Sequence, residues 1–386
     1  MAQIMADALK ILIVKDRRSA GGGIYEYFEA IAPHLTHACR FCEVGRPQAY
    51  MGGRETGGRL ASGARVLGDW LRLAWQILRF RPGLVHLNAG LDREERSLKR
   101  EAVSLGIARL LGCPVLVFWH GWDHPAKGGE QFPGGRGGWL WKSYARAAAH
   151  VVLASRFADD LKRWGFAAPV HLATTVIPPL LLERDAGHAA GGGKGLLFLS
   201  RVERAKGLWE LVEAYALLKA RDPDYRLVIA GDGPDLPALK QKVADLALAD
   251  VIFPGFVDGE RKLECLREAS IFCFPSYSEG MPLAVLEALA AGLPVVSSDV
   301  GGLRDILING EHGILLRLRP EDAQGLRIDP VEIASAIRLL SDNPESSRAI
   351  GRHNAAYARD RFSPEKIAGN LEAIYRSLDE RGYGRR

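Results

Sequence analysis

Short apolar runs that alternate with longer segments of helical periodicity are the feature that most constrains the fold of this chain. Each run is four to seven residues long and rich in Val, Ile, Leu or Phe. The runs are residues 11–14, 84–87, 114–119, 150–154, 196–200, 225–231, 251–256, 271–275 and 294–298. Near-continuous apolar strands between helices are typical of parallel sheets that are covered on both faces. The pattern therefore predicts an α/β protein with doubly wound parallel sheets.

The 386 residues suffice for two domains. Residues 183–195, ERDAGHAAGGGKG, lack periodicity and are rich in Gly and Ala, which is typical of a linker. We expect a first domain over 1–182, a second over 196–361 and a terminal helix within 362–386. Two such sheets would create a cleft at the carboxyl ends of their strands, where open α/β sheets bind ligands.

Composition excludes several classes of protein. With 47% apolar and 25% charged residues, the chain is neither disordered nor collagen-like. No apolar run approaches the roughly 18–20 residues that span a bilayer. The first residues lack the pattern of a secretory signal, so we expect a cytoplasmic protein with reduced thiols.

The two halves of the chain differ in charge. Residues 1–182 carry 24 Lys and Arg against 15 Asp and Glu, whereas residues 183–386 carry 27 against 31. In the expected helix over 64–80, arginines at positions 65, 72 and 79 fall on one face and tryptophans lie elsewhere. Such a helix can lie on an anionic membrane surface. The alternative is a sheet-covering helix with solvated arginines.

One cluster offers metal-ligating atoms. His34, His37, Cys39 and Cys42 lie close together in the sequence. One CxxC pair is fewer than the two pairs of a zinc ribbon, and the segment also has the pattern of a strand after a helix. We therefore predict structural cysteines and no metal.

The segment 276–299 contains the clearest candidate for an anion site. It follows an apolar strand, and Pro282 suits the first position of a helix, where its missing N–H is not needed. Free backbone N–H groups at a helix N-terminus bind phosphate well. We expect these groups to come from Gly280, Met281 and Leu283.

Two carboxylates accompany this anion site. Glu279 would repel a phosphate, so it is better suited to accepting hydrogen bonds from sugar hydroxyls. Glu287 lies among apolar helix residues and needs donors, which a ribose diol would supply. The alternative is a helix-capping Glu279 and an incidental Glu287.

Two cations follow another strand. Arg201 comes directly after the run 196–200, and Lys206 precedes the next helix. Together they would neutralise a diphosphate leaving group.

Near the N-terminus, three consecutive glycines, Gly21 to Gly23, would let the backbone approach a ligand. Their spacing is not the G-x-G-x-x-G of dinucleotide-binding proteins, which disfavours a hydride-transfer enzyme.

A polar and aromatic group follows the strand expected over 114–118. His120 would face the cleft and hydrogen-bond a sugar. Trp119 and Trp122 would offer flat apolar faces to sugar rings on the acceptor side. The alternative is that His120 is structural.

These segments, in this order, resemble the family 4 retaining glycosyltransferases of GT-B fold. The most specific part is the E-x7-E motif from Glu279 to Glu287, followed by ALAAGLPVVSSDVGG. LSRVERAKG (199–207), VIAGDGP (228–234) and PGFV (254–257) match as well. The resemblance covers nearly the whole chain. It implies two Rossmann-like domains that face each other across a cleft, with a last helix that returns to the first domain.

The resemblance also implies roles for individual residues. Glu279 and His120 would contact the donor sugar, and Glu287 the ribose. Donor binding would further involve Arg201, Lys206, Gly22 and Gly23 at the diphosphate, and the backbone of Phe256 and Val257 at the base. The family is usually independent of metals, and its first domain generally receives the acceptor. We expect no cofactor.

Together with these residues, the resemblance implies a retaining, metal-independent hexosyltransferase. It would use a UDP- or GDP-sugar and a glycan or lipid-linked acceptor in the synthesis of cell-surface polysaccharide or glycolipid. The basic first half predicts peripheral association with an anionic membrane and an anionic acceptor. Alternatives are a sugar phosphorylase, a nucleotide-sugar epimerase or a non-catalytic sugar-nucleotide binder. No nucleic-acid-binding module is recognisable.

Overall fold

The computed structural model describes residues 9–17, 23–45, 59–91, 96–122, 132–182, 193–321 and 325–382. The chain forms two compact units. Unit 1 comprises Met1–Val176 and Pro364–Arg386, and unit 2 comprises Ile177–Ser363. The last segment of the chain therefore belongs with the first.

Unit 1 contains a six-stranded sheet whose strand pairs are all parallel, in the order β2-β1-β3-β4-β5-β6. Its strands are β1 (Lys10–Asp16), β2 (Ala38–Val44), β3 (Leu84–Leu91), β4 (Val115–Trp122), β5 (Ala149–Val152) and β6 (Val170–Leu172). Its helices are α1 (Gly23–Ile31), α2 (Arg59–Phe80), α3 (Arg96–Leu110), α4 (Trp139–Tyr144), α5 (Ser155–Arg163) and α14 (Pro364–Glu380), with a 3-10 turn at Ala32–His34.

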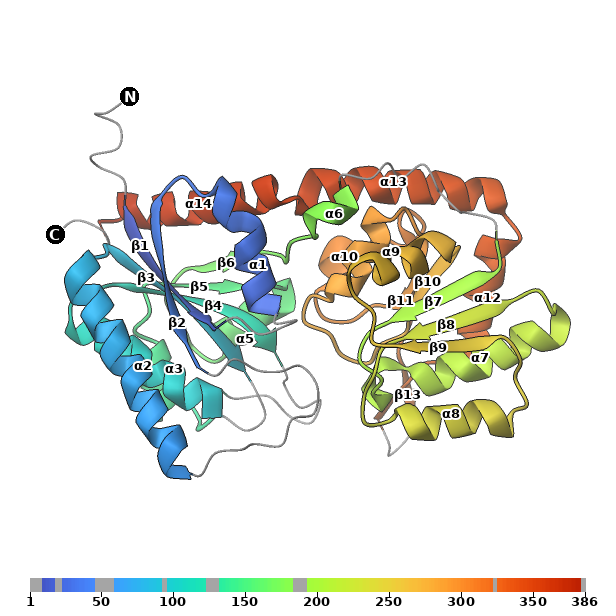
Figure 1. The fold of residues 1–386 in the computed structure, drawn as a ribbon, viewed down its shortest axis with the longest axis horizontal. Helices are drawn as coiled ribbons and strands as arrows, with labels where there is room; N and C mark the ends of the chain where they lie inside the picture. The colour runs from blue at the N-terminus through green and yellow to red at the C-terminus, as the bar shows by residue number, and fades with distance from the viewer. Residues whose placement is uncertain are drawn as a thin grey trace. The chain divides into compact units, whose positions relative to one another are not determined.

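Side chains of strand β1 alternate between the two faces of this sheet. Leu12 packs with Leu73 of α2 in one buried cluster, together with residues of α3. On the opposite face, Phe28 of α1 lies 5.5 Å from the ring of His86, and His86 hydrogen-bonds Tyr375 of α14. Helices α2 and α3 thus cover one face, and α1 and α14 the other (Figure 1).

Unit 2 contains a second parallel sheet, in the order β12-β11-β10-β7-β8-β9. Its strands are β7 (Gly195–Leu199), β8 (Arg226–Ala230), β9 (Val251–Gly255), β10 (Ile271–Phe274), β11 (Val295–Ser298) and β12 (Gly313–Leu316), and an antiparallel pair joins β13 (Arg319–Glu321) and β14 (Gly325–Arg327). Its helices are α6 (Pro179–Leu182), α7 (Leu208–Arg221), α8 (Leu236–Asp245), α9 (Gly259–Glu268), α10 (Leu283–Ala290), α11 (Leu303–Ile306), α12 (Pro330–Ser341) and α13 (Pro344–Phe362), with a 3-10 turn at Arg204–Lys206.

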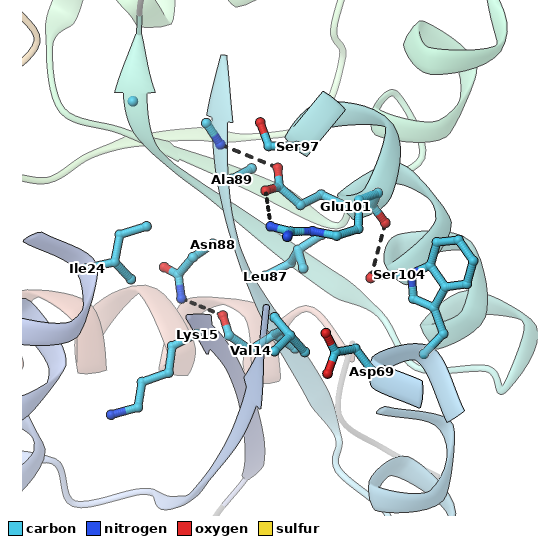
Figure 2. Close-up of a pocket in the computed structure, with 15 residues that line it drawn as sticks. Val14, Lys15, Ile24, Asp69, Leu87, Asn88, Ala89, Ser97, Glu101 and Ser104 are labelled. Atoms are coloured by element: carbon cyan, nitrogen blue, oxygen red, sulfur yellow. Dashed lines mark hydrogen bonds and ion pairs between the residues drawn. The ribbon is translucent and has the colours of Figure 1, made fainter. Parts of the chain in front are cut away.

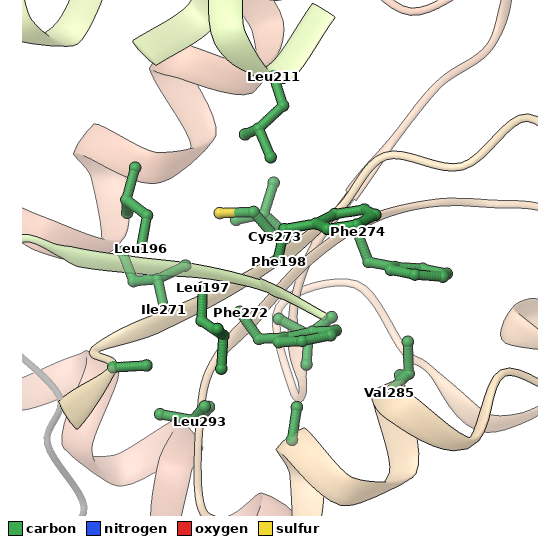
Figure 3. Close-up of a cluster of buried hydrophobic side chains, with 14 of the residues drawn as sticks. Leu196, Leu197, Phe198, Leu211, Ile271, Phe272, Cys273, Phe274, Val285 and Leu293 are labelled. Carbon is green, nitrogen blue, oxygen red and sulfur yellow. The ribbon is translucent and has the colours of Figure 1, made fainter. Parts of the chain in front are cut away.

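The core of unit 2 lies on both faces of its sheet. Figure 3 shows Leu211 of α7 on one side of the strands and Val285 of α10 on the other. Strand β10 is buried at all four positions, which explains why its sequence is apolar without alternation. The expected class, two doubly wound parallel-sheet domains, is therefore the observed one.

The division between the units lies at Val176/Ile177 rather than after residue 182. Ile177 is fully buried in the unit 2 core, and its N–H donates to the Phe362 carbonyl at 3.0 Å. Residues 183–192 of the expected linker lie outside the described residues, and strand β7 already begins at Gly195. The terminal helix begins at Pro364, because Ser363 has an extended backbone that ends α13.

Candidate active site

Two loops of unit 2 meet at the carboxyl ends of β7 and β10, because these strands are neighbours. The backbone N–H of Tyr277 donates to the Ala205 carbonyl at 2.9 Å. The ammonium of Lys206 lies 2.6 Å from Glu279 Oε1 and 5.8 Å from the centre of the Phe274 ring. The side chains of Lys206 and Glu279 are only 19% and 8% exposed. The structure thus joins two residues to which the sequence assigned separate roles.

Glycines hold these loops at close approach. Gly207 has φ +69°, and a Cβ there would lie 1.8 Å from the Pro275 carbonyl oxygen. Gly301 has φ +53°, and a Cβ there would lie 1.8 Å from the Glu279 carbonyl oxygen. Only glycine fits either position, so both glycines help to place the Lys206–Glu279 pair.

Helix α10 begins at Leu283, and Pro282 is its N-cap, one position earlier than expected. The missing N–H of Pro282 is harmless there as well, because the first N–H groups of a helix have no intrahelical acceptor. In the described part of the chain, the N–H groups of Gly280, Met281 and Leu283 donate to no protein acceptor. The Gly302 N–H donates to the Gly280 carbonyl at 2.8 Å and orients this turn. This end of the helix can therefore accept an anion.

Glu287 is buried on α10, with 2% of its side chain exposed. Lys262 of α9 lies 2.7 Å from its Oε1 and supplies the donor that a buried carboxylate needs. Sequence reasoning missed Lys262, since nothing in its own segment marks it.

The other donor-side candidates of unit 2 lie at loop positions. Arg201 is 61% exposed and forms an ion pair with Glu203 at 3.0 Å. Phe256 is partly exposed after β9, whereas the side chain of Val257 is buried in the core. The roles predicted for all three at the donor stay predictions.

His120 of unit 1 lies within β4, which extends to Trp122 instead of ending at residue 118. Its Nε2 is 2.8 Å from Asn88 Oδ1, while Asn88 Nδ2 donates to the Val14 carbonyl at 2.7 Å. Asn88 Oδ1 must therefore accept, so His120 carries its proton on Nε2 and has a lone pair on Nδ1. Burial, aided by the nearby His86, lowers the pKa of His120 to about 3. His120 is thus a neutral hydrogen-bond acceptor at neutral pH.

The prediction that Trp119 and Trp122 present open faces to a sugar is wrong. Trp119 is 1% exposed, and its Nε1 donates to His150 at 3.2 Å. Trp122 is stacked on Phe157, with ring centres 4.4 Å apart, and on Trp164. Both tryptophans belong to the core on the face of the unit 1 sheet that α2 and α3 cover.

The glycine-rich loop lies mostly outside the described residues. This holds for Gly21 and Gly22, while Gly23 is the first residue of α1. The approach of Gly22 and Gly23 to a diphosphate stays a prediction.

Two groups in the described residues bear on metal binding. Cys39 and Cys42 lie three residues apart on β2, so they point to opposite faces and cannot share a metal. Glu311, His312 and His353 have ligand atoms within 4.8 Å of one another. However, His312 Nδ1 accepts the Ile308 N–H at 3.0 Å, which leaves the proton on Nε2 and no lone pair for an ion. This second cluster is poorly suited to metal.

Comparisons with known proteins show that this chain is similar to glycosyltransferases. Residues 183–356 match the family model described as glycosyl transferases group 1. The chain is 32% identical over 234 residues to a D-inositol 3-phosphate glycosyltransferase of Pseudarthrobacter chlorophenolicus, covering 59% of this chain and 53% of that protein. It is 33% identical over 188 residues to a phosphatidyl-myo-inositol mannosyltransferase of Mycobacterium tuberculosis, covering 48% of each. The chain thus spans about half the length of these curated relatives.

A solved structure of similar fold is that of the Anabaena protein HepE in complex with UDP. The two chains superpose with a TM-score of 0.72 at 15% identity, covering 96% of this chain and 100% of that one. These findings confirm the predicted GT-B fold and the predicted resemblance to glycosyltransferases. In the described residues, no helix combines the length and the apolar character that a membrane span requires.

Proposed function

We propose that this chain, whose residues 183–356 match the glycosyl transferases group 1 family, is a retaining glycosyltransferase. It transfers a hexosyl group from a UDP- or GDP-sugar to a hydroxyl of a glycan or lipid-linked acceptor, in the synthesis of cell-surface polysaccharide or glycolipid. The observation that carries the proposal is the Lys206–Glu279 pair beside the open N-terminus of α10. A cation, a carboxylate and free N–H groups suit a sugar diphosphate, which offers both charge and hydroxyls.

The leaving diphosphate develops negative charge in the transition state. Lys206 and the N–H groups of Gly280, Met281 and Leu283 are preorganised donors that would stabilise this charge. When the diphosphate takes hydrogen bonds from Lys206, Glu279 is released to accept from a hydroxyl of the donor sugar. Lys206 and these N–H groups would stabilise the charge that a metal ion stabilises in other transferases, so we propose metal-independent transfer without a cofactor.

Glu279 and Glu287 are not the acid and base of a glycosidase. Such a pair flanks one glycosidic bond. Here each carboxylate has its own lysine, Lys206 or Lys262, at 2.6 and 2.7 Å. Two separately neutralised carboxylates support two binding roles, with Glu287 and Lys262 at the ribose side of the donor.

A hydrolysis screen tests the proposal. Purified protein is incubated with UDP-, GDP- and ADP-sugars, and release of the nucleoside diphosphate is measured, with and without phosphate. Release without phosphate, with retained anomeric configuration in the transfer product, is the expected result. Phosphate-dependent turnover of a glycan without any nucleotide would favour a sugar phosphorylase, and isomerisation of the donor sugar without release or acceptor would favour an epimerase. Binding without turnover of any donor would favour a non-catalytic sugar-nucleotide binder.

Peripheral membrane association forms the second part of the proposal, and the exposed face of α2 supports it. Four large apolar side chains, each more than half exposed, lie along one stripe of this helix. They are Leu67, Leu71, Trp75 and Leu78. The opposite face, with Leu73 and Ile77, is buried in the unit 1 core.

The positive charge of α2 favours an anionic bilayer as the partner that covers this apolar stripe. Arg72 and Arg79 are exposed on the same helix. Anionic lipid would attract them, whereas a second copy docked on the same stripe would bring like charges together. We therefore propose that the protein works at the inner face of the membrane while remaining a cytoplasmic protein.

Sedimentation with vesicles tests this second part. Binding to vesicles that contain anionic lipid is expected, with a loss at high salt. Leu71→Ser should reduce binding, while Leu110→Ser, a matched change at an exposed leucine of α3, should not. Equal binding by both variants, or none by the wild type at low salt, would contradict the membrane proposal.

A further inference from the structure

Unit 1 contains a cavity of about 260 Å³ at the carboxyl ends of its central strands. Its walls come from β1, β2 and β3, from the end of β4 and from helices α1, α2 and α3 (Figure 2). Strand β1 lies between β2 and β3, so the chain leaves β1 toward one edge of the sheet and returns on the other side. A crevice at such a switch point is the usual ligand site of an open α/β sheet.

Two glycines leave one wall of the cavity bare. Gly90 of β3 pairs with Gly121 of β4, directly after a register shift between the strands. A Cβ at Gly90 would meet no atom within 4 Å. The space in front of Gly90 is therefore open, and no side chain of the strand pair fills it.

The charged groups of the lining are neutralised within the protein. Asp69 accepts from Arg17 at 3.0 Å and from the Gly45 N–H at 2.8 Å. Lys15 is buried and forms an ion pair with Glu29 at 3.1 Å. The remaining acid and base of the lining, Glu101 and Arg100, lie 3.6 Å from each other. Since each charge has its counterpart, the cavity favours a neutral ligand over a phosphate.

The rest of the cavity lining contains both apolar and polar side chains. Val14, Ile24 and Leu87 contribute apolar surface, and Ser97 and Ser104 contribute hydroxyls. The indole N–H of Trp70 is buried and has no hydrogen-bond partner in the described structure. A buried donor without an acceptor costs free energy, so an oxygen of a ligand would satisfy it.

We propose that this cavity binds one neutral, polyhydroxylated six-membered ring, a sugar or a cyclitol, as the ring that accepts the hexosyl group. The ring has apolar C–H faces for the aliphatic walls and hydroxyl oxygens for the Trp70 indole. The volume of about 260 Å³ is slightly below the roughly 300–1,000 Å³ of sites for drug-sized ligands, which suits a single ring. The assignment as acceptor rests on the proposed function.

The cavity also adjoins the residue that orients His120. Asn88 lines it and accepts from His120 Nε2. A bound ring would therefore lie against the side chain that fixes the His120 tautomer. The anionic part of a lipid-linked acceptor, expected from the basic charge of residues 1–182, would remain outside this cavity.

The indole resonance of Trp70 gives a test that does not depend on activity. Protein labelled with 15N-tryptophan is titrated with glucose, mannose, N-acetylglucosamine and myo-inositol, and separately with inorganic phosphate. The Trp70 signal is identified as the one lost in Trp70→Phe. At least one neutral ring should shift this signal at millimolar concentration, and phosphate should not.

A pair of glycine variants tests the location. Gly90→Ala places a methyl group in the open space and should weaken ring binding about 10-fold or more. Gly106→Ala, at an equally open position of α3 outside the lining, should bind the ring like the wild type. The KM for the acceptor should likewise be higher in Gly90→Ala than in Gly106→Ala.

The outcomes separate this proposal from the proposed function. If no neutral ring shifts the Trp70 signal, if phosphate shifts it as well, or if Gly90→Ala binds like Gly106→Ala, the cavity proposal is wrong. If a ring shifts the signal but no nucleotide sugar is turned over, the cavity stands as a ring-binding site and the transferase proposal fails.

Discussion

Replacement of Gly301 by alanine should impair the candidate donor site by displacing the backbone of Glu279. The new Cβ would lie 1.8 Å from the Glu279 carbonyl oxygen, whereas Cβ contacts under 3.0 Å are essentially not found. The backbone of Glu279 must therefore move by about 1.2 Å, and the carboxylate that pairs with Lys206 moves with it. A misplacement of about 1 Å can reduce turnover about 10²-fold.

A matched variant separates this displacement from the cost of the backbone conformation. Gly310 also has a positive φ, +88°, but a Cβ there would meet nothing within 4 Å. Alanine at either position costs about 1–2 kcal/mol, because an L-residue is strained in the left-handed region. Gly301→Ala should lose a further 1–3 kcal/mol or so through the steric clash.

Two measurements decide the outcome. Urea unfolding gives the free energy of unfolding of each variant, and release of nucleoside diphosphate from a saturating donor gives turnover. We expect Gly301→Ala to be less stable and about 10²-fold slower than Gly310→Ala. Equal stability and equal turnover of the two variants would refute the reasoning.

Further predictions concern charge, metal and pH. Lys206→Ala should lower turnover about 10²–10³-fold without unfolding, as expected for loss of one transition-state donor, while Lys242→Ala, which removes a distant ion pair of equal length, should retain turnover. EDTA should leave activity largely intact; complete loss that Mg²⁺ or Mn²⁺ restores would contradict metal-independent transfer. Burial lowers the pKa of His86, His120 and His150 to about 3 in the folded state, against about 6.5 unfolded. The unfolded chain therefore takes up more protons below pH 6.5, and the free energy of unfolding should fall from pH 7 to pH 5, by at most about 1.4 kcal/mol per histidine per pH unit. Tryptophan emission during urea unfolding measures this, and stability that does not change over this range would contradict it.

The fold could be predicted because the strands are short, apolar and separated by helices. Residues 271–275 were expected as a strand, and β10 is Ile271–Phe274. Periodicity shows such elements locally, but it does not show which loops meet. The Lys206–Glu279 pair joins positions 73 residues apart, and Lys262 reaches Glu287 from a different helix. Only the sheet order brings these residues together.

The error at Trp119 and Trp122 has a specific cause. The strand was expected to end at residue 118, but β4 continues to Trp122. Trp119 therefore continues the alternation of Val115 and Val117 on the face that α2 and α3 cover, and all three belong to one buried cluster. His120 falls on the other face, beside Phe118, where its ring centre is 4.0 Å away. The position of a strand end thus decided which side chains could face a ligand.

The return of α14 to unit 1 has a consequence for how the protein folds during its synthesis. Unit 2 is continuous in the sequence, and its last residue emerges from the ribosome before α14 does. Until α14 emerges, unit 1 lacks two of its contacts. Glu372 of α14 accepts the Thr36 N–H at 2.7 Å, and Tyr375 of α14 hydrogen-bonds His86 at 2.6 Å. Domains usually complete their folding from the N-terminus onward. Here unit 1 can be completed only after unit 2 has emerged, although most of unit 1 is synthesised first.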